Sequence, residues 1–211
     1  MLNQTKDILK KKIRANKLHA IRFKKYSEYK NYFISEDKKS NWDPSAFTKI
    51  IETHLVNKKK LILVEIGVAR GATSLYTIKS LKNRIDSYFG IDPYKSNYDK
   101  KDIVSSYNQD LMDNCYLYVL DKVRDPKFKL LRLTSENASN LFSDQSIDAI
   151  FIDGDHTYEG VTNDINFWKS KIKKGGIMIG DDYNTFSDVK KAVQENFTDF
   201  IVDENCWYVK V

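Results

Sequence analysis

The sequence has few residues of the types that mark special classes of protein. Its 211 residues include two cysteines, three prolines and eight glycines, and no apolar run reaches the roughly 18 residues of a membrane-spanning helix. Cys115 and Cys206 cannot form a disulfide framework, and neither belongs to a CxxC pair. The first residues are charged but lack the apolar stretch of a secretory signal. We therefore expect a cytoplasmic protein that is neither collagen-like nor membrane-spanning.

The chain does have enough apolar material for a core, because hydrophobic residues make up 41% of it and aromatic residues 13%. Its length suits one domain with a short appendage. The appendage is more basic than the rest of the chain. Residues 1–40 contain 12 Lys and Arg against four Asp and Glu, whereas the whole chain has a net charge of +6. We predict a basic helical N-terminal segment over residues 1–45 and one domain over residues 46–211.

Segments typical of strands and helices alternate along the chain. Short apolar runs at 61–66, 88–91, 128–133, 147–152 and 176–179 indicate buried strands, followed by two late strands at 200–202 and 207–209. Helical patterns lie at 44–55, 73–81, 111–123, 138–142, 158–172 and 189–197, and an earlier helix runs from Leu2 to about Tyr32. This alternation predicts an α/β fold, with a doubly wound, mostly parallel sheet and helices on both faces.

Polar residues follow each predicted parallel strand. Open α/β sheets bind ligands beyond the carboxyl ends of their strands, near the point where the strand order reverses. The residues at these ends are Glu65 with the turn Gly67–Gly71, Asp92, Ser135 with Glu136 and Asn137, Asp153–His156, and Asp181 with Asp182. Turn chemistry explains any one of these groups, but it does not readily explain five at equivalent positions.

The first three groups suit a nucleoside ligand. Gly67 and Gly71 allow the backbone to approach a ligand closely, and the helix that follows offers free N–H groups; the alternative is an ordinary tight turn. Asp92 can accept two ribose hydroxyls, or it can be a residue that only forms a turn. Ser135 and Glu136 either line an adenine slot or cap the next helix.

The acidic groups after the last two parallel strands carry the sharpest signal. If these strands are neighbours, Asp153, Asp181 and Asp182 converge, and clustered carboxylates repel one another unless a cation joins them. Oxygen ligands suit Mg²⁺ or Mn²⁺. His156 follows Asp153 by three residues and can overhang the same pocket as a general base. The alternatives are an exposed cluster of turn residues and an ordinary surface or core histidine.

These residues carry a resemblance to a known family. Residues 64–74 (VEIGVARGATS) resemble the cofactor loop of class I S-adenosylmethionine-dependent methyltransferases. The paired segments 151–160 (FIDGDHTYEG) and 174–183 (KGGIMIGDDY) resemble the metal-dependent small-molecule O-methyltransferases, especially those that methylate macrolide sugars. The resemblance runs from about Leu61 to the C-terminus. It implies a Rossmann-like, seven-stranded sheet whose last strand is antiparallel.

The resemblance also implies roles for single residues. Asp92 would bind the cofactor ribose, Asp153, Asp181 and Asp182 would bind Mg²⁺ (or Mn²⁺), and His156 would be the catalytic base. The full set of residues expected to bind S-adenosylmethionine is Glu65, Gly67, Gly71, Ser74, Asp92, Ser135, Glu136 and Asp153. The expected activity is methyl transfer to a hydroxyl oxygen of a small molecule, first of all a sugar or glycan.

The sequence leaves the acceptor open, because residues 1–60 are short and highly basic and depart from the family pattern. A catechol or other phenol is one alternative. A nucleic acid is another, since the basic residues near the N-terminus can contact phosphates. The same residues can form a solvated helix face, or an arm that packs on a second subunit of a homo-oligomer. A non-catalytic cofactor-binding module is an alternative of a different class, and the intact set of carboxylates argues against it.

Overall fold

The computed structural model describes residues 25–98 and 106–211, so most of the helix predicted from Leu2 lies outside the described residues. The chain separates into two units, residues 1–40 and residues 41–211. In the first unit, residues 25–39 are helical. This helix runs past the expected end at Tyr32 because neither Gly nor Pro occurs before residue 40. Within the described ranges, no helix is long and apolar enough to cross a membrane.

The second unit is built on a seven-stranded sheet with the strand order β3-β2-β1-β4-β5-β7-β6. The strands are β1 (Leu61–Ile66), β2 (Ile85–Ile91), β3 (Phe128–Leu131), β4 (Ile147–Ile152), β5 (Ile172–Gly180), β6 (Ile201–Asp203) and β7 (Cys206–Lys210). Strands β1 to β5 pair in parallel, and β7 pairs antiparallel with both β5 and β6. The predicted fold class is therefore confirmed, including the antiparallel last strand.

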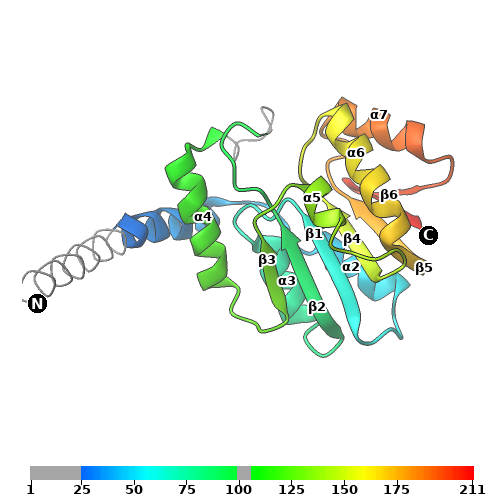
Figure 1. Cartoon of the computed structure of the whole chain (residues 1–211), viewed down its shortest axis with the longest axis horizontal. Helices are drawn as coiled ribbons and strands as arrows, with labels where there is room; N and C mark the ends of the chain where they lie inside the picture. Colours follow the sequence, from blue (N-terminus) through cyan, green and yellow to red (C-terminus); the bar gives the residue numbers. More distant parts are fainter. Residues whose placement is uncertain (1–24, 99–105) are drawn as a thin grey trace, which may run out of the picture. The chain divides into compact units, whose positions relative to one another are not determined.

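Helices cover both faces of this sheet (Figure 1). On one face, α5 (Ser135–Ser139), α6 (Tyr158–Trp168) and α7 (Ser187–Asn196) bury the main hydrophobic core against the strands. On the other face lie α2 (Ala46–His54) and α3 (Ala72–Ser80), where Phe47 of α2 stacks on Phe151 of β4. A further helix, α4 (Gln109–Lys122), follows the segment after β2. The chain thus winds to both sides of β1 and β4, and the strand order reverses between these two strands.

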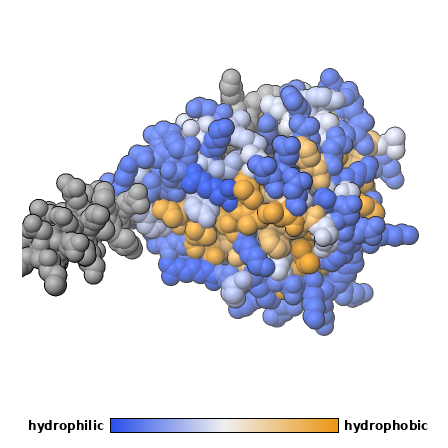
Figure 2. All heavy atoms as spheres, in the orientation of Figure 1, coloured by the Kyte–Doolittle hydropathy of each residue, from blue (hydrophilic) through white to orange (hydrophobic). Residues whose placement is uncertain are grey.

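The two central strands are the most deeply buried. All six residues of β4 are buried, as are five of the six in β1, which is expected of parallel strands covered on both faces. Coverage is thinner over β1 to β3, where Figure 2 shows hydrophobic side chains at the surface. Phe89 and Leu131 of this region are partly buried.

Some element bounds differ from those expected. Helix α5 begins at Ser135 rather than residue 138, because the Thr134 hydroxyl accepts the N–H of Asn137 and so caps an earlier start. Helix α6 ends at Trp168 rather than at residue 172, and a short 3₁₀ helix (Lys169–Lys171) follows it. Strand β5 begins at Ile172, four residues before its predicted start at Gly176, and ends at Gly180.

Candidate active site

One edge of the sheet holds several of the predicted site residues because the parallel hydrogen-bond ladder continues one residue beyond each strand. Four backbone N–H groups donate to carbonyl oxygens of neighbouring strands at 2.9–3.2 Å: Gly67 to Ile91, Asp92 to Leu131, Asp153 to Ile66 and Asp181 to Ile152. The sheet register therefore places these residues at the carboxyl edge, on both sides of the strand-order reversal. The expectation that these strand ends share one edge is confirmed.

The turn after β1 requires glycine at both of its ends. Gly67 has a φ of +84°, and a Cβ there would overlap the carbonyl oxygen of Asp153. Gly71 has a φ of +71° and directly precedes α3. Only glycine adopts this left-handed conformation without strain and permits such a close approach. The turn therefore packs directly against the end of β4, and α3 begins immediately after it.

Asp92 joins this turn to the loop after β2. Its Oδ2 accepts the N–H groups of Val68 at 3.1 Å and Ala69 at 3.0 Å. Its Oδ1 accepts the N–H of Tyr94 at 2.7 Å. Asp92, for which the resemblance implies a role in ribose binding, thus joins the turn after β1 to the loop after β2.

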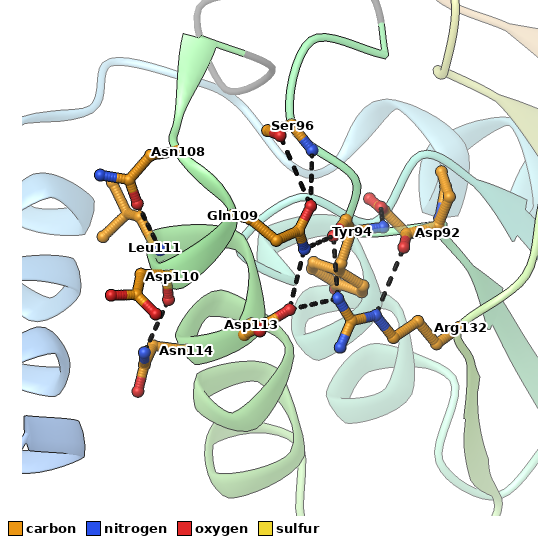
Figure 3. Close-up of polar contacts among 11 residues, drawn as sticks. Asp92, Tyr94, Ser96, Asn108, Gln109, Asp110, Leu111, Asp113, Asn114 and Arg132 are labelled. Atoms are coloured by element: carbon orange, nitrogen blue, oxygen red, sulfur yellow. Dashed lines mark hydrogen bonds and ion pairs between the residues drawn. The ribbon is translucent and has the colours of Figure 1, made fainter. Parts of the chain in front are cut away.

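A polar network that sequence reasoning missed holds the loop after β2 (Figure 3). The carbonyl oxygen of Tyr94 accepts one hydrogen bond from Gln109 Nε2 at 2.9 Å and another from Arg132 Nη2 at 3.0 Å. Arg132 also forms an ion pair with Asp113 of α4. No signal in the sequence indicated this role, because Arg132 lies within the predicted strand 128–133, whereas β3 ends at Leu131.

A cavity of about 330 Å³ opens beside this network, at the carboxyl ends of β2 and β3. This volume falls at the lower end of the range typical of small-molecule sites. The lining residues are Pro93, Tyr94, Lys95, Gln109, Arg132, Leu133, Thr134 and Asn137. Pro93, which directly follows Asp92 in the chain, lines the cavity, whereas Asp92 itself does not.

The acidic end of the edge brings Asp153, His156 and Asp182 together. His156 Nε2 lies 2.9 Å from Asp182 Oδ2 and 3.7 Å from Asp153 Oδ1. One ligand atom from each residue lies within 4.8 Å of the others. Asp181 lies outside this group of three, and its Oδ1 accepts the N–H of Asp182 at 2.7 Å. The structure thus groups His156, predicted as a base, with two of the three predicted metal ligands.

Burial controls the charges in this cluster. It raises the pKa of Asp153 to about 7, although the hydrogen bond from His156 acts in the opposite direction. Burial also raises the pKa of Asp181. For Asp182 burial again raises the pKa, but the hydrogen bond and the charge of His156, together with hydrogen bonds from Thr185 and Asn205, outweigh it, and the pKa is lowered overall. A bound cation would relieve the buried negative charge, and the carboxylate oxygens of Asp153 and Asp182 are ligands that Mg²⁺ and Mn²⁺ accept.

Two residues predicted to bind the cofactor lie inside the protein. Glu65 is 1% exposed and Ser74 is fully buried. The Ser74 hydroxyl donates to the Glu65 carboxyl group, and the Tyr88 hydroxyl donates to the same oxygen at 2.7 Å. Burial raises the pKa of Glu65 to about 8, against the effect of both hydrogen bonds. The three side chains brace α3 against β1 and β2, and direct cofactor contact by Glu65 and Ser74 stays a prediction.

Ser135 and Glu136 occupy different environments at the beginning of α5. The Ser135 hydroxyl accepts a hydrogen bond from Trp168 Nε1 at 2.8 Å in the buried interior. It also hydrogen-bonds to Asp164, whose pKa burial raises to about 7. Glu136 is exposed. The structure thus places the Ser135 side chain in the core, and the cofactor-binding roles of both residues stay predictions.

The methyltransferase domain family matches residues 64–183, which is more than half of the chain. The matched segment begins in β1 and includes the glycine turn, Asp92 and the whole acidic cluster. The chain belongs to this family. The resemblance seen in the glycine turn and in the two acidic segments is thereby confirmed at the level of the methyltransferase domain.

One curated relative is uncharacterized protein R132 of Acanthamoeba polyphaga mimivirus, which is 28% identical to this methyltransferase over 134 residues. The match includes 61% of this chain and 54% of R132. The methyltransferase therefore spans about half the length of this relative.

Solved structures share the fold of this methyltransferase. One is CalS11, a TDP-rhamnose 3′-O-methyltransferase of calicheamicin biosynthesis, with a TM-score of 0.53, 11% identity, and coverage of 80% of this chain and 78% of CalS11. Another is MycE of the mycinamycin pathway, solved with Mg, SAH and mycinamycin VI, with a TM-score of 0.52 and 14% identity. That match covers 78% of this chain and 48% of MycE. At these identities the likeness shows the fold alone.

Proposed function

We propose that this methyltransferase transfers the methyl group of S-adenosylmethionine to a hydroxyl oxygen of a small molecule, with a sugar or glycan as the first candidate. The observation that carries the proposal is the convergence of Asp153, His156 and Asp182 next to the glycine turn. The resemblance to sugar O-methyltransferases supports it, as does the fold shared with CalS11 and MycE.

The proposed cofactor site runs from the turn Gly67–Gly71 to Asp92 and the neighbouring cavity. S-adenosylmethionine supplies a methyl group on a positively charged sulfur when it is bound. The glycine turn provides backbone at close range and the N-terminus of α3. Asp92 provides a carboxylate at the end of β2 that can accept ribose hydroxyls. The cavity beside Pro93 suits the adenosine part of the cofactor.

The proposed chemistry takes place at the acidic cluster. Asp153 and Asp182, together with Asp181, would hold a Mg²⁺ or Mn²⁺ ion. The ion supplies a Lewis acid that stabilises negative charge on the acceptor oxygen. With the cation on the carboxylates, the neutral imidazole of His156 would accept the hydroxyl proton at Nε2, the nitrogen that faces the carboxylates. The acceptor oxygen forms the new C–O bond while the methyl C–S bond breaks, and S-adenosylhomocysteine leaves.

An acceptor panel tests the reaction class. The full chain is incubated with methyl-labelled S-adenosylmethionine and Mg²⁺ in the presence of nucleotide sugars, glycosylated macrolides, catechols or RNA. We expect label on a sugar hydroxyl and its loss after EDTA treatment, with recovery on adding Mg²⁺. Full activity in the metal-stripped enzyme contradicts the metal role. Label on RNA or catechol alone contradicts the sugar assignment, and tight cofactor binding without any transfer favours a non-catalytic module.

Calorimetric binding of S-adenosylmethionine tests the cofactor site without an acceptor. We expect Asp92→Ala to weaken binding by about 10–100-fold, the range of a lost hydrogen bond to a charged group. Asp86→Ala is the matched control, because it removes an exposed carboxylate near the other end of the same strand. Equal affinities for the wild type and Asp92→Ala contradict the proposed site.

A further inference from the structure

The turn between β6 and β7 contacts both acidic residues that follow β5. Asp203 pairs with Cys206 across this hairpin, so the connecting turn consists of Glu204 and Asn205. Asn205 Nδ2 lies 3.2 Å from Asp181 Oδ1 and 3.2 Å from Asp182 Oδ1. One amide group therefore bridges two adjacent carboxylates from a part of the chain more than 20 residues away.

The amide of Asn205 can face in only one direction. Its Oδ1 lies 3.0 Å from the backbone N–H of Asn184, which can only donate. The oxygen is thus fixed on that side, and the two hydrogens of Nδ2 must face the carboxylates of Asp181 and Asp182. Thr185 Oγ1 lies 3.3 Å from Oδ1 and 3.1 Å from Nδ2 of the same amide. Nδ2 thus has three oxygens within 3.2 Å, one from each of the two carboxylates and one from Thr185.

The backbone of the turn is also fixed to the loop after β5. The N–H of Tyr183 donates to the carbonyl oxygen of Asn205 at 2.9 Å. The side-chain amide of Asn184 donates to the carbonyl oxygen of Glu204 at 2.6 Å. Because β7 pairs directly with β5, the hairpin and the acidic loop form one hydrogen-bonded unit. Asn205 is therefore held in place by contacts that do not involve the carboxylates.

The two aspartates need such a partner. Asp182 has a φ of +62°. Residues other than glycine rarely adopt this left-handed backbone conformation, and those that do are often found at functional sites. Adjacent carboxylates also repel each other. Within the described part of the chain, the hydrogen bonds to the side chain of Asp181 all go to Oδ1, from Asp182 N, Asn205 Nδ2 and Cys206 Sγ. Its other oxygen remains for another ligand.

We propose that Asn205 is a positioning residue for the divalent cation. It holds Oδ1 of Asp182, whose Oδ2 lies in the cluster with His156 and Asp153. It also holds Oδ1 of Asp181 and leaves the other oxygen of that carboxylate for the cation. The inference rests on the proposed function, because it assumes that these carboxylates bind metal. It adds the C-terminal hairpin to the site, a part of the chain to which neither the acidic segments nor the family match extends.

Binding of Mn²⁺ tests this role without cofactor, acceptor or turnover. Free Mn²⁺ is measured by electron paramagnetic resonance during titration of the full chain. We expect Asn205→Ala to weaken binding about 10- to 100-fold, the usual effect of losing a hydrogen bond to a metal ligand. Asn205→Leu, which keeps the size of the side chain but lacks the amide, should give the same loss. Asn184→Ala is the matched control, because it removes a hydrogen bond to the same turn but leaves its backbone N–H in place.

The outcomes separate this inference from the proposed metal site. Asp153→Asn and Asp182→Asn are titrated in parallel, and the melting temperature of each variant is recorded. If these two variants lose Mn²⁺ binding while both Asn205 variants bind like the wild type, the positioning role is overturned and the metal site stands. A lower melting temperature with unchanged affinity also overturns it, since Asn205 is then only structural. No binding by the wild type overturns both proposals.

Discussion

The phenyl ring of Phe186 stacks on the imidazole of His156, with ring centroids 4.6 Å apart and an interplanar angle of 27°. Phe186 directly precedes α7 and His156 lies just before α6, so the contact joins the beginnings of two neighbouring helices. Asp182 contacts the edge of the same imidazole at Nε2. One face and one edge of the ring are therefore fixed, which sets the direction of Nε2 before an acceptor binds.

Phe186→Leu should lower kcat by up to about tenfold, because an aromatic pair of this kind contributes about 0.5–1.5 kcal/mol beyond its buried area. The dissociation constant of S-adenosylmethionine should not change, since Phe186 lies at the acidic cluster and not among the residues lining the cavity. Phe186→Tyr keeps the ring and should retain activity. Steady-state kinetics with calorimetry measures both quantities, and a normal kcat for Phe186→Leu would show that the stack does not orient the base.

His156→Ala should reduce kcat by about 10²–10⁴-fold, the usual contribution of a positioned general base. Binding of S-adenosylmethionine should stay at the wild-type level, because the imidazole contacts Asp182 and Phe186 rather than the glycine turn. Single-turnover transfer and calorimetry are measured on the same preparation. Parallel loss of binding and turnover would assign His156 a structural role instead.

Glu65→Gln should remove a pH dependence of stability. With its pKa raised to about 8 by burial, folded Glu65 keeps its proton at neutral pH, whereas the unfolded chain releases it above about pH 4.5. This contribution to stability is therefore complete at low pH, is lost as the pH rises toward 8, and then levels off. Relative to Glu65→Gln, the wild type should lose about 1 kcal/mol per pH unit between pH 5 and pH 8.

Urea unfolding at several pH values measures this difference. Gln keeps the carbonyl oxygen that accepts from Ser74 and Tyr88, so the variant should remain folded. Glu52→Gln on the exposed face of α2 is the control, and its curve should parallel that of the wild type. Parallel curves for Glu65→Gln as well would mean that the Glu65 carboxyl group is already ionised in the folded protein at neutral pH.

The edge of the sheet can be predicted from the sequence because its signals are local. A strand covered on both faces is a short apolar run, and the next polar residue marks its carboxyl end. For this reason the bounds of β1 and β4 agree with the prediction to the residue, and Gly67 and Asp153 lie where it placed them. The parallel ladder then brings these residues together without further information from the sequence.

The partners of single side chains could not be predicted because they depend on packing between distant elements. The hydroxyl of Ser135 meets Trp168, 33 residues later, and so faces the core rather than the edge. Asn205 reaches Asp181 only through the antiparallel pairing of β7 with β5. No local pattern distinguishes these residues from ordinary cap or turn residues, and the same holds for the network around Arg132.

Gly67→Ala should destabilise the protein far more than Gly175→Ala, although both glycines have a similar positive φ, +84° and +75°. A left-handed conformation costs an alanine about 1–2 kcal/mol at either position. At Gly175 a Cβ would meet nothing within 4 Å, whereas at Gly67 it would overlap the backbone of Asp153. Urea unfolding should therefore show only the conformational cost for Gly175→Ala. For Gly67→Ala it should show an additional loss, because β1 and β4 must separate at their carboxyl ends. Equal losses of stability for the two variants would mean that the glycine turn can move away from β4. The fold would then not need close packing between this turn and the acidic cluster.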